Sequence, residues 1–395
     1  MLFVKTNELT PGMRLAKPIY NKMGVLLYER DTPLTQQGII SVENFGLIGL
    51  FILEPSEPAP PITKDELEFE QFQTVYMFKI KDIMDRLQKD KPANSIRDLA
   101  YNIYLHYGTL DHKLHFTQNL RSSADYVYKH ALSVAILSAM IAKEMHISNE
   151  NTLGLVEAAL LYDFGCLFIP PAINEKGDNL DRSDVEKIQA SLERGYALVE
   201  PHAADISISE TAMKIMRCAI FDEDTKGNKL LTLLLHILKV ADRFDRMTAM
   251  NINKEPSSEL AAIKFLRSHK EDFNQLIVGA LANCIHILPT GACLDLKGGG
   301  KALVIQDNPH DFAHPMILNL ADNKIYDLSD EKVRANIEII DIMKTMDNRI
   351  KTDEKTLEQF VADEHTSEVI NHFREKKILL AERRKERERA MLDVE

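Results

Sequence analysis

The sequence has few cysteines, and they are far apart. Cys166, Cys218, Cys284 and Cys293 form no CxxC pair and no dense framework, so the pattern indicates neither a zinc knuckle nor a disulfide scaffold. A reducing compartment such as the cytosol is the natural setting for such thiols. The 395 residues are easily enough to bury hydrophobic cores, and this length suits two or three packed units.

Long apolar runs are also missing. The first eight residues lack the apolar stretch of a secretory signal, and the uncharged run at residues 131–142 is shorter than the roughly 20 residues that span a bilayer. We therefore expect no membrane span and a soluble, cytoplasmic protein. A net charge of -12 argues against broad binding to nucleic acid or to an anionic membrane surface.

The N-terminal part alternates short apolar runs with turn residues. Residues 1–54 therefore predict a small α+β module, with a strand over residues 25–28 and a short helix over residues 34–45. Four prolines follow within eight residues, and they cannot continue a helix or a strand ladder. We expect a proline-rich linker over residues 55–63.

Helical spacing dominates from residue 64 to residue 250. Apolar side chains recur at steps of three and four around His130, and they are Val127, Val134, Leu137 and Ile141. Further helices are predicted over residues 152–162, 230–248 and 258–286. The expected fold class is mainly α, with an α-helical bundle at its centre.

Short strands are predicted after the bundle, at residues 292–296, 302–306 and 316–320. Three glycines at residues 298–300 predict a hairpin turn rather than a phosphate cradle, because no helix N-terminus follows them. We expect a small strand unit at residues 289–328 to close a domain of residues 64–330. Residues 331–395 predict a helical extension, with charge pairs at residues 374–389 that suit an exposed helix or a docking arm.

Five blocks follow one another in a recognisable order. They read LTPGMRLAKPIY at residues 9–20, KHALSVA at 129–135, EAALLYDFGC at 157–166, LKVADRFD at 238–245 and LPTGACLDL at 288–296. In this order they resemble the HD-GYP branch of the HD-domain phosphohydrolases, together with the module often found ahead of HD-GYP domains. The resemblance covers about the first 330 residues and implies an HD-type helical domain.

The resemblance also implies a metal-dependent chemistry. Active members use histidines and aspartates to hold two or three divalent ions, which activate a water molecule against a cyclic di-GMP phosphodiester. Carried over residue by residue, the relict metal positions are His130, Asp163 and Asp242.

Several positions depart from the family pattern. Tyr162 and Ser191 stand where the family has histidines, and Cys166 stands where it has a lysine. The H-H-E…G-Y-P stretch is missing from residues 213–229. Three remaining ligands can hold at most one weakly bound divalent ion, whereas a two-metal site clamps the phosphate with cations about 3.5–4 Å apart. We therefore predict no catalytic residues and no tightly bound cofactor.

Each of these candidate residues also has a purely structural interpretation. His130 also suits a core histidine, and Asp163 and Asp242 also suit structural pairing with Lys129 or Arg243. His202 and His236 are more typical of ordinary surface or core histidines than of replacement ligands. The acidic residues 222–224 suit a solvated loop.

Three functional hypotheses remain. The first is a catalytically inactive HD-GYP-like protein that binds a protein partner as a scaffold or regulator, by family analogy within cyclic di-GMP signalling or motility. The second is a sensor that binds cyclic di-GMP without cutting it, with Arg243 as the phosphate contact. The third is a residual single-metal phosphodiesterase. A homodimer is left open.

Overall fold

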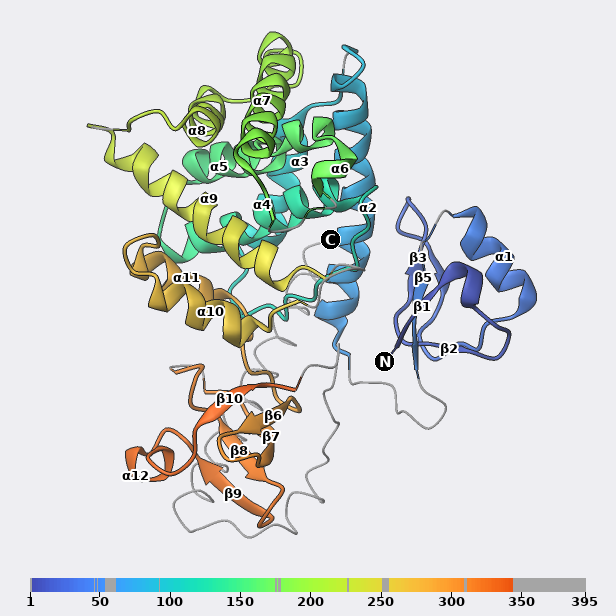
Figure 1. Ribbon diagram of the computed structural model, residues 1–395, viewed down its shortest axis with the longest axis vertical. Coiled ribbons are helices and arrows are strands. Elements are labelled where there is room, and N and C mark those ends of the chain that lie inside the picture. Colours follow the sequence, from blue (N-terminus) through green and yellow to red (C-terminus); the bar gives the residue numbers. More distant parts are fainter. Residues whose placement is uncertain are drawn as a thin grey trace, which may run out of the picture. The chain divides into compact units, whose positions relative to one another are not determined.

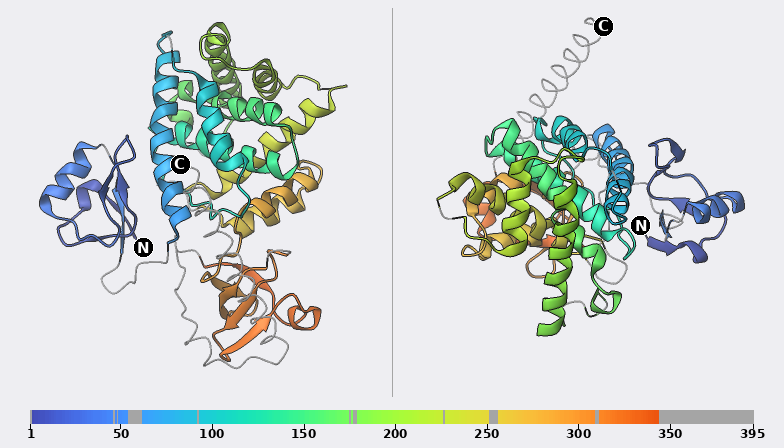
Figure 2. Two further views of the ribbon diagram at one scale, coloured as in Figure 1. Left: turned by 180° about the vertical axis from the view of Figure 1, so that it is seen from behind. Right: turned by 90° about the horizontal axis from the view of Figure 1, so that it is seen from above.

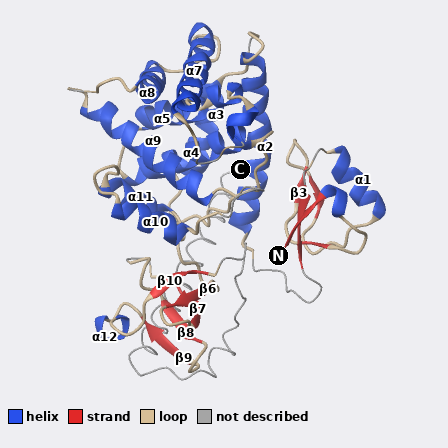
Figure 3. Ribbon diagram, in the orientation of Figure 1, coloured by secondary structure: helices blue, strands red, loops and turns tan. Residues whose placement is uncertain are grey.

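The structure is a computed structural model that describes residues 2–45, 47, 49–53, 62–91, 93–174, 176, 179–225, 227–250, 256–308 and 311–343. Most of the expected linker and the charge-paired residues 374–389 lie outside these residues. The described chain is mainly α, as predicted, and its strands are confined to the two ends of the described range (Figure 3).

The chain divides into two compact units, Met1–Ile287 and Leu288–Glu395. This division falls inside residues 64–330, which we expected to be one domain, and the domain bounds themselves stay predictions.

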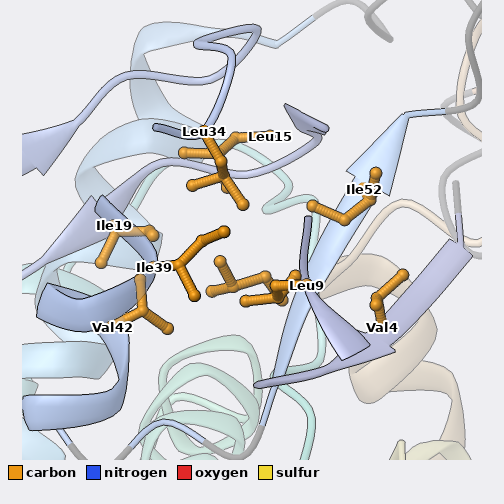
Figure 4. Close-up of a cluster of buried hydrophobic side chains, with 9 residues drawn as sticks. Val4, Leu9, Leu15, Ile19, Leu34, Ile39, Val42 and Ile52 are labelled. Atoms are coloured by element: carbon orange, nitrogen blue, oxygen red, sulfur yellow. The ribbon is translucent and has the colours of Figure 1, made fainter. Parts of the chain in front are cut away.

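The N-terminal module is a small sheet with one helix. Its three-stranded antiparallel sheet has the order β1-β5-β2, a hairpin adds β3 and β4, and a helix α1 follows. The bounds are β1 Leu2–Lys5, β2 Arg14–Leu15, β3 Ile19–Tyr20, β4 Leu26–Tyr28, α1 Gln36–Asn44 and β5 Gly49–Leu53. Apolar side chains from α1 and from the strands, such as Ile39 and Ile52, meet in one buried cluster (Figure 4). The predicted strand and helix of this module are both present.

Helices form the rest of the first unit (Figure 1). The long helix α2 begins with a capping box, in which Thr63 and Glu66 each accept a hydrogen bond from the other's backbone amide. It lies along one side of the bundle in both views of Figure 2. The helices are α2 Lys64–Leu87, α3 Ile96–Ile103, α4 Tyr126–Glu144, α5 Asn149–Leu161, α6 Pro171–Asn174, α7 Arg182–Val199, α8 Glu210–Phe221, α9 Lys229–Thr248, α10 Glu259–Ser268 and α11 Gln275–Cys284.

Helix α4 is the centre of the bundle. It packs against α2, α5, α9 and α11, and every residue from 130 to 142 is buried. A helix that is apolar on all sides belongs inside a protein rather than on its surface. The segment Asn149–Phe168, which contains α5, is long and apolar enough to cross a membrane, but 72% of its apolar window is buried in the described protein. Packing in the core accounts for that composition.

One predicted helix is wrong in its extent. Residues 258–286 form two helices, α10 and α11, with a break after Ser268. The break has a local cause, because the Asn274 side chain accepts a hydrogen bond from the Leu276 amide and begins a new helix.

The second unit is a five-stranded antiparallel sheet of order β10-β6-β7-β8-β9. Its strands are β6 Cys293–Leu296, β7 Lys301–Gln306, β8 Met316–Asn319, β9 Lys324–Asp327 and β10 Ile339–Ile342. The first three were predicted. Gly298 and Gly299 both have positive φ angles in the hairpin between β6 and β7, as expected of a turn rather than a phosphate cradle.

The prediction of a helical extension from residue 331 is wrong at its start. Only Glu331–Arg334 is helical there, and β10 then pairs with β6 as an edge strand of the sheet. Two neighbouring β-branched residues, Ile339 and Ile340, favour a strand, and the exposed edge of β6 supplies the backbone partners. No periodicity in the sequence revealed that edge.

Two glycines bring the α5 end of the bundle close to α7. A Cβ atom on Gly165 would lie 2.4 Å from the Ser191 carbonyl oxygen, and one on Gly195 would lie 2.4 Å from the Gly165 amide nitrogen. Real Cβ atoms do not approach backbone so closely. Glycine at both positions therefore allows the turn Phe164–Phe168 to contact the backbone of α7, which fixes Tyr162 and Asp163 just before it.

We expect Gly165→Ala to destabilise the protein by about 1–3 kcal/mol, because the added methyl group meets backbone that has to move. Gly279→Ala is the matched control, since Gly279 lies inside α11 with nothing within 4 Å of its Cβ position. That change should leave the stability unchanged or raise it by up to about 1 kcal/mol. Urea unfolding of both variants checks this, and equal midpoints would contradict the close contact.

Candidate functional site

The three relict metal positions converge at one place. His130 lies in the second turn of α4, Asp163 follows α5, and Asp242 lies near the end of α9. One ligand atom from each lies within 4.8 Å of the other two, and the described residues contain no other such group of three or more. Residues more than 100 positions apart in the sequence thus share a site.

His130 is fully buried and makes contacts through both ring nitrogens. Its Nδ1 lies 2.6 Å from Asp245 Oδ2. Its Nε2 lies 3.1 Å from Asp242 Oδ1, 3.2 Å from Asp163 Oδ2 and 2.8 Å from the Tyr162 hydroxyl. The Tyr162 hydroxyl in turn donates to Asp242 Oδ1 at 2.5 Å. The residue that replaces the family's histidine therefore satisfies an aspartate by hydrogen bonding.

Asp245 extends the cluster into the core. Arg121, also buried, donates from Nη1 and Nη2 to the two carboxylate oxygens of Asp245, each at 2.6 Å. Gln118 donates to the same carboxylate at 3.0 Å. A paired guanidinium and carboxylate with two parallel hydrogen bonds is the strongest of such pairs. This pair holds the loop before α4 against α9.

Arg246 bridges the two remaining carboxylates. Its Nε donates to both oxygens of Asp242, at 2.8 and 3.0 Å, and its Nη2 donates to Asp163 Oδ2 at 2.5 Å. The Arg246 side chain is 37% exposed, whereas those of Asp163 and Asp242 are 8% and 23% exposed. The guanidinium therefore covers the carboxylates from the solvent side.

The pKa directions agree with this geometry. Burial raises the pKa of Asp163 and of Asp242. Arg246 and His130 lower these pKa values by more than burial raises them, so both carboxyl groups have pKa values below the usual range. Burial and Arg246 lower the pKa of His130, yet the hydrogen bonds that its ring donates to three carboxylates raise the pKa well above its ordinary value. The imidazole is therefore protonated, and three cations balance three carboxylates.

The predicted pairing of Asp163 and Asp242 with Lys129 or Arg243 is wrong. Lys129 donates to Asp125 at 2.5 Å and to the Leu120 carbonyl at 2.6 Å. Arg243 lies over the ring of Phe265, 4.7 Å from its centre. Arg243 is one residue beyond Asp242, about 100° around the helix, whereas Arg246 is one turn beyond and on the same face.

Sequence reasoning missed three members of the cluster, Asp245, Arg246 and Arg121. The first two carried a usable signal, because steps of three and four from Asp242 place them on its face of α9. Arg121 lies in a loop between helices, where no periodicity points to a partner.

The other substituted positions also have local roles. The Ser191 hydroxyl donates to the Lys187 carbonyl within α7. Burial, and then the nearby Asp163, raise the pKa of the Cys166 thiol well above its ordinary value, which keeps it neutral. Neither residue is a cation that could bind phosphate.

The alternative ligands lie apart from the cluster. His202 contacts Asp90 at 2.7 Å and Asp205 at 3.3 Å. His236 is not among the residues that converge on His130. In the acidic segment, Asp222 ends α8 in a left-handed conformation and Glu223 pairs with Arg217 at 2.7 Å.

The side chains present do not fit a two-metal centre. Both carboxylates that could bind an ion are already bound by a guanidinium, and both nitrogens of His130 face carboxylate oxygens. A fourth position, which the resemblance assigns to a histidine, holds Tyr162, whose hydroxyl donates a hydrogen bond to Asp242.

Comparisons with known proteins show which family model and which proteins this chain resembles. Residues 111–274 match the family model described as HD domain. The cyclic di-GMP phosphodiesterase PdeB of Borreliella burgdorferi is 23% identical over 194 residues, 48% of this chain and 51% of that protein. The cyclic di-GMP phosphodiesterase PA4108 of Pseudomonas aeruginosa is 20% identical over 231 residues, 56% of this chain and 53% of that protein. The chain thus spans about half the length of these curated relatives.

A solved structure, the HDG"Y"P protein Bd1817 of Bdellovibrio bacteriovorus, is 13% identical with a TM-score of 0.40, and covers 71% of this chain and 97% of its own. No conclusion follows at that score. The HD-domain match contains the whole cluster from Arg121 to Arg246, so the cluster lies in an HD-type domain. The chain is HD-GYP-like, as the resemblance predicted.

The raised pKa of His130 predicts a fall in stability as the pH rises. The folded protein keeps this proton at pH values where the unfolded chain loses it, so the stabilisation is complete below about pH 6.5 and is lost toward the higher folded pKa. We expect the free energy of unfolding to fall by up to about 1.4 kcal/mol per pH unit as the pH rises above about 6.5.

Urea unfolding across that range measures the slope, and ring-proton NMR of His130 reports the proton directly. Loss of the ring proton near its ordinary pKa would contradict the geometry of the cluster.

Proposed function

We propose that this HD-GYP-like protein does not hydrolyse phosphodiesters and instead acts as a regulator that binds a protein partner. The observation that carries the proposal is the closed ion cluster, in which Arg246 holds Asp163 and Asp242 together. A phosphodiesterase of this kind needs those carboxylates for cations that bind the phosphate and activate water.

The residues around the cluster support the same proposal. The site has a tyrosine, a neutral thiol and a helix-bonded serine at the three substituted positions. One substitution could be compensated by a neighbour. Together they leave no second cation ligand set and no phosphate-binding lysine among the described residues of the site.

The relatives suggest the pathway. Two of them are named cyclic di-GMP phosphodiesterases, and we propose that this chain acts in cyclic di-GMP signalling through the fold it shares with them. This step is an analogy at the level of family.

A surface on α3 and the turn that follows suits protein binding. Tyr101 and Leu105 are 49% and 45% exposed and lie four residues apart, on one side of the helical segment. The ring of Tyr104 lies 6.5 Å from that of Tyr101. Large apolar side chains grouped on a surface are typical of contact sites.

The catalytic part of the proposal is tested with purified full-length protein, cyclic di-GMP, and manganese or ferrous ions. We expect no turnover, with the Borreliella relative as the active control in the same assay. Turnover that is lost in His130→Ala would contradict the proposal and favour the residual single-metal phosphodiesterase.

Calorimetry with cyclic di-GMP should show no heat of binding, and a stoichiometric heat without turnover would instead support the sensor.

The binding part is tested by a pull-down from bacterial lysate with wild-type protein and with Tyr101→Ser/Leu105→Ser. We expect a specific partner to be lost or weakened at least about tenfold in the double variant, because anchoring apolar contacts of this kind contribute more than about 1 kcal/mol each. Met23→Ser is the control, since Met23 is 74% exposed on the N-terminal module. Equal recovery by all three proteins would argue against this surface.

A further inference from the structure

Two carboxylates from distant parts of the chain face each other beside His130. Asp163 and Asp242 each lie near His130 Nε2, and their side chains are mostly buried. Two anions so placed repel each other unless a cation lies between them. The structure provides that cation from the chain itself.

Arg246 is well placed to do this. It follows Asp242 by one helical turn on α9, so its guanidinium contacts Asp242 through Nε and reaches across to Asp163 through Nη2. A tethered cation has a high effective concentration at its site, and a free ion must displace it to bind. The Arg246 side chain is also the most exposed member of the bridge, so it lies between the carboxylates and solvent.

The ligand atoms beneath the guanidinium are arranged for one ion. His130, Asp163 and Asp242 offer one nitrogen and two oxygens within 4.8 Å of one another. Ligands of a first-row metal ion at about 2.1 Å lie about 3–4 Å apart, so small side-chain movements would suffice to bind one ion. Nitrogen and carboxylate ligands suit manganese, iron or zinc.

We propose that the Arg246 guanidinium takes the place of a divalent metal ion, and that its removal opens a single-ion site made by His130, Asp163 and Asp242. The proposal rests on the proposed function in treating the wild-type site as non-catalytic, and it adds the residue that closes the site. Its readout is metal binding rather than turnover, so the two can fail separately.

The experiment measures Mn²⁺ binding to full-length protein, after chelator treatment, by calorimetry and by metal content after dialysis. We expect Arg246→Met to bind about one ion per chain, at least about tenfold more tightly than wild type. Arg243→Met is the matched control, because it removes the same charge from the neighbouring turn without touching the carboxylates. It should bind manganese no better than wild type.

A second variant protects the test against misfolding. Arg246→Met/Asp242→Asn lacks one ligand and should lose the gained binding. If Arg246→Met is unstable without metal, Mn²⁺ should raise its melting temperature, since a ligand that binds only the folded state stabilises it. Manganese bound equally by wild type and Arg246→Met, no gain over Arg243→Met, or binding unaffected by Asp242→Asn would each overturn the proposal.

Discussion

The pairing of buried charge around His130 is the constraint on which the rest of the structure depends. Three carboxylates lie next to a buried imidazole, and each must have a compensating cation, because removing an unpaired charge from water costs several kcal/mol. Arg121 comes from the loop before α4 and Arg246 from α9. Helices α4, α5 and α9 therefore meet in an arrangement that satisfies six charged groups at once.

This arrangement explains how the helices around His130 can pack together without an ion from solution. The site keeps the histidine and aspartates at the positions that the resemblance assigns to metal ligands, but a guanidinium now neutralises the carboxylates. Neutralisation by a side chain maintains the helix contacts and needs no ion from solution.

Close backbone contact supports the cluster from the outside. The contact between Gly165 and α7 fixes the turn after α5, and that turn sets the direction of Tyr162 and Asp163. Burial of α4 on every side fixes His130 in the same way. The cluster is thus held by packing as well as by charge, and a small shift of either turn would move the Asp163 oxygen away from Arg246.

The sequence by itself determined the helical class of the protein and most of the helices and strands, because apolar periodicity is a local property of a chain. The resemblance carried by the order of its motifs singled out His130, Asp163 and Asp242, and the structure brings them together. The same resemblance predicts which family positions carry other residues. Only the tertiary structure decided that Arg246 rather than Arg243 or Lys129 pairs with the aspartates, and that β10 completes the second sheet. The contact between Arg246 and Asp163 and the pairing of β10 with β6 join residues more than 40 positions apart, and spacing along the chain does not contain that distance.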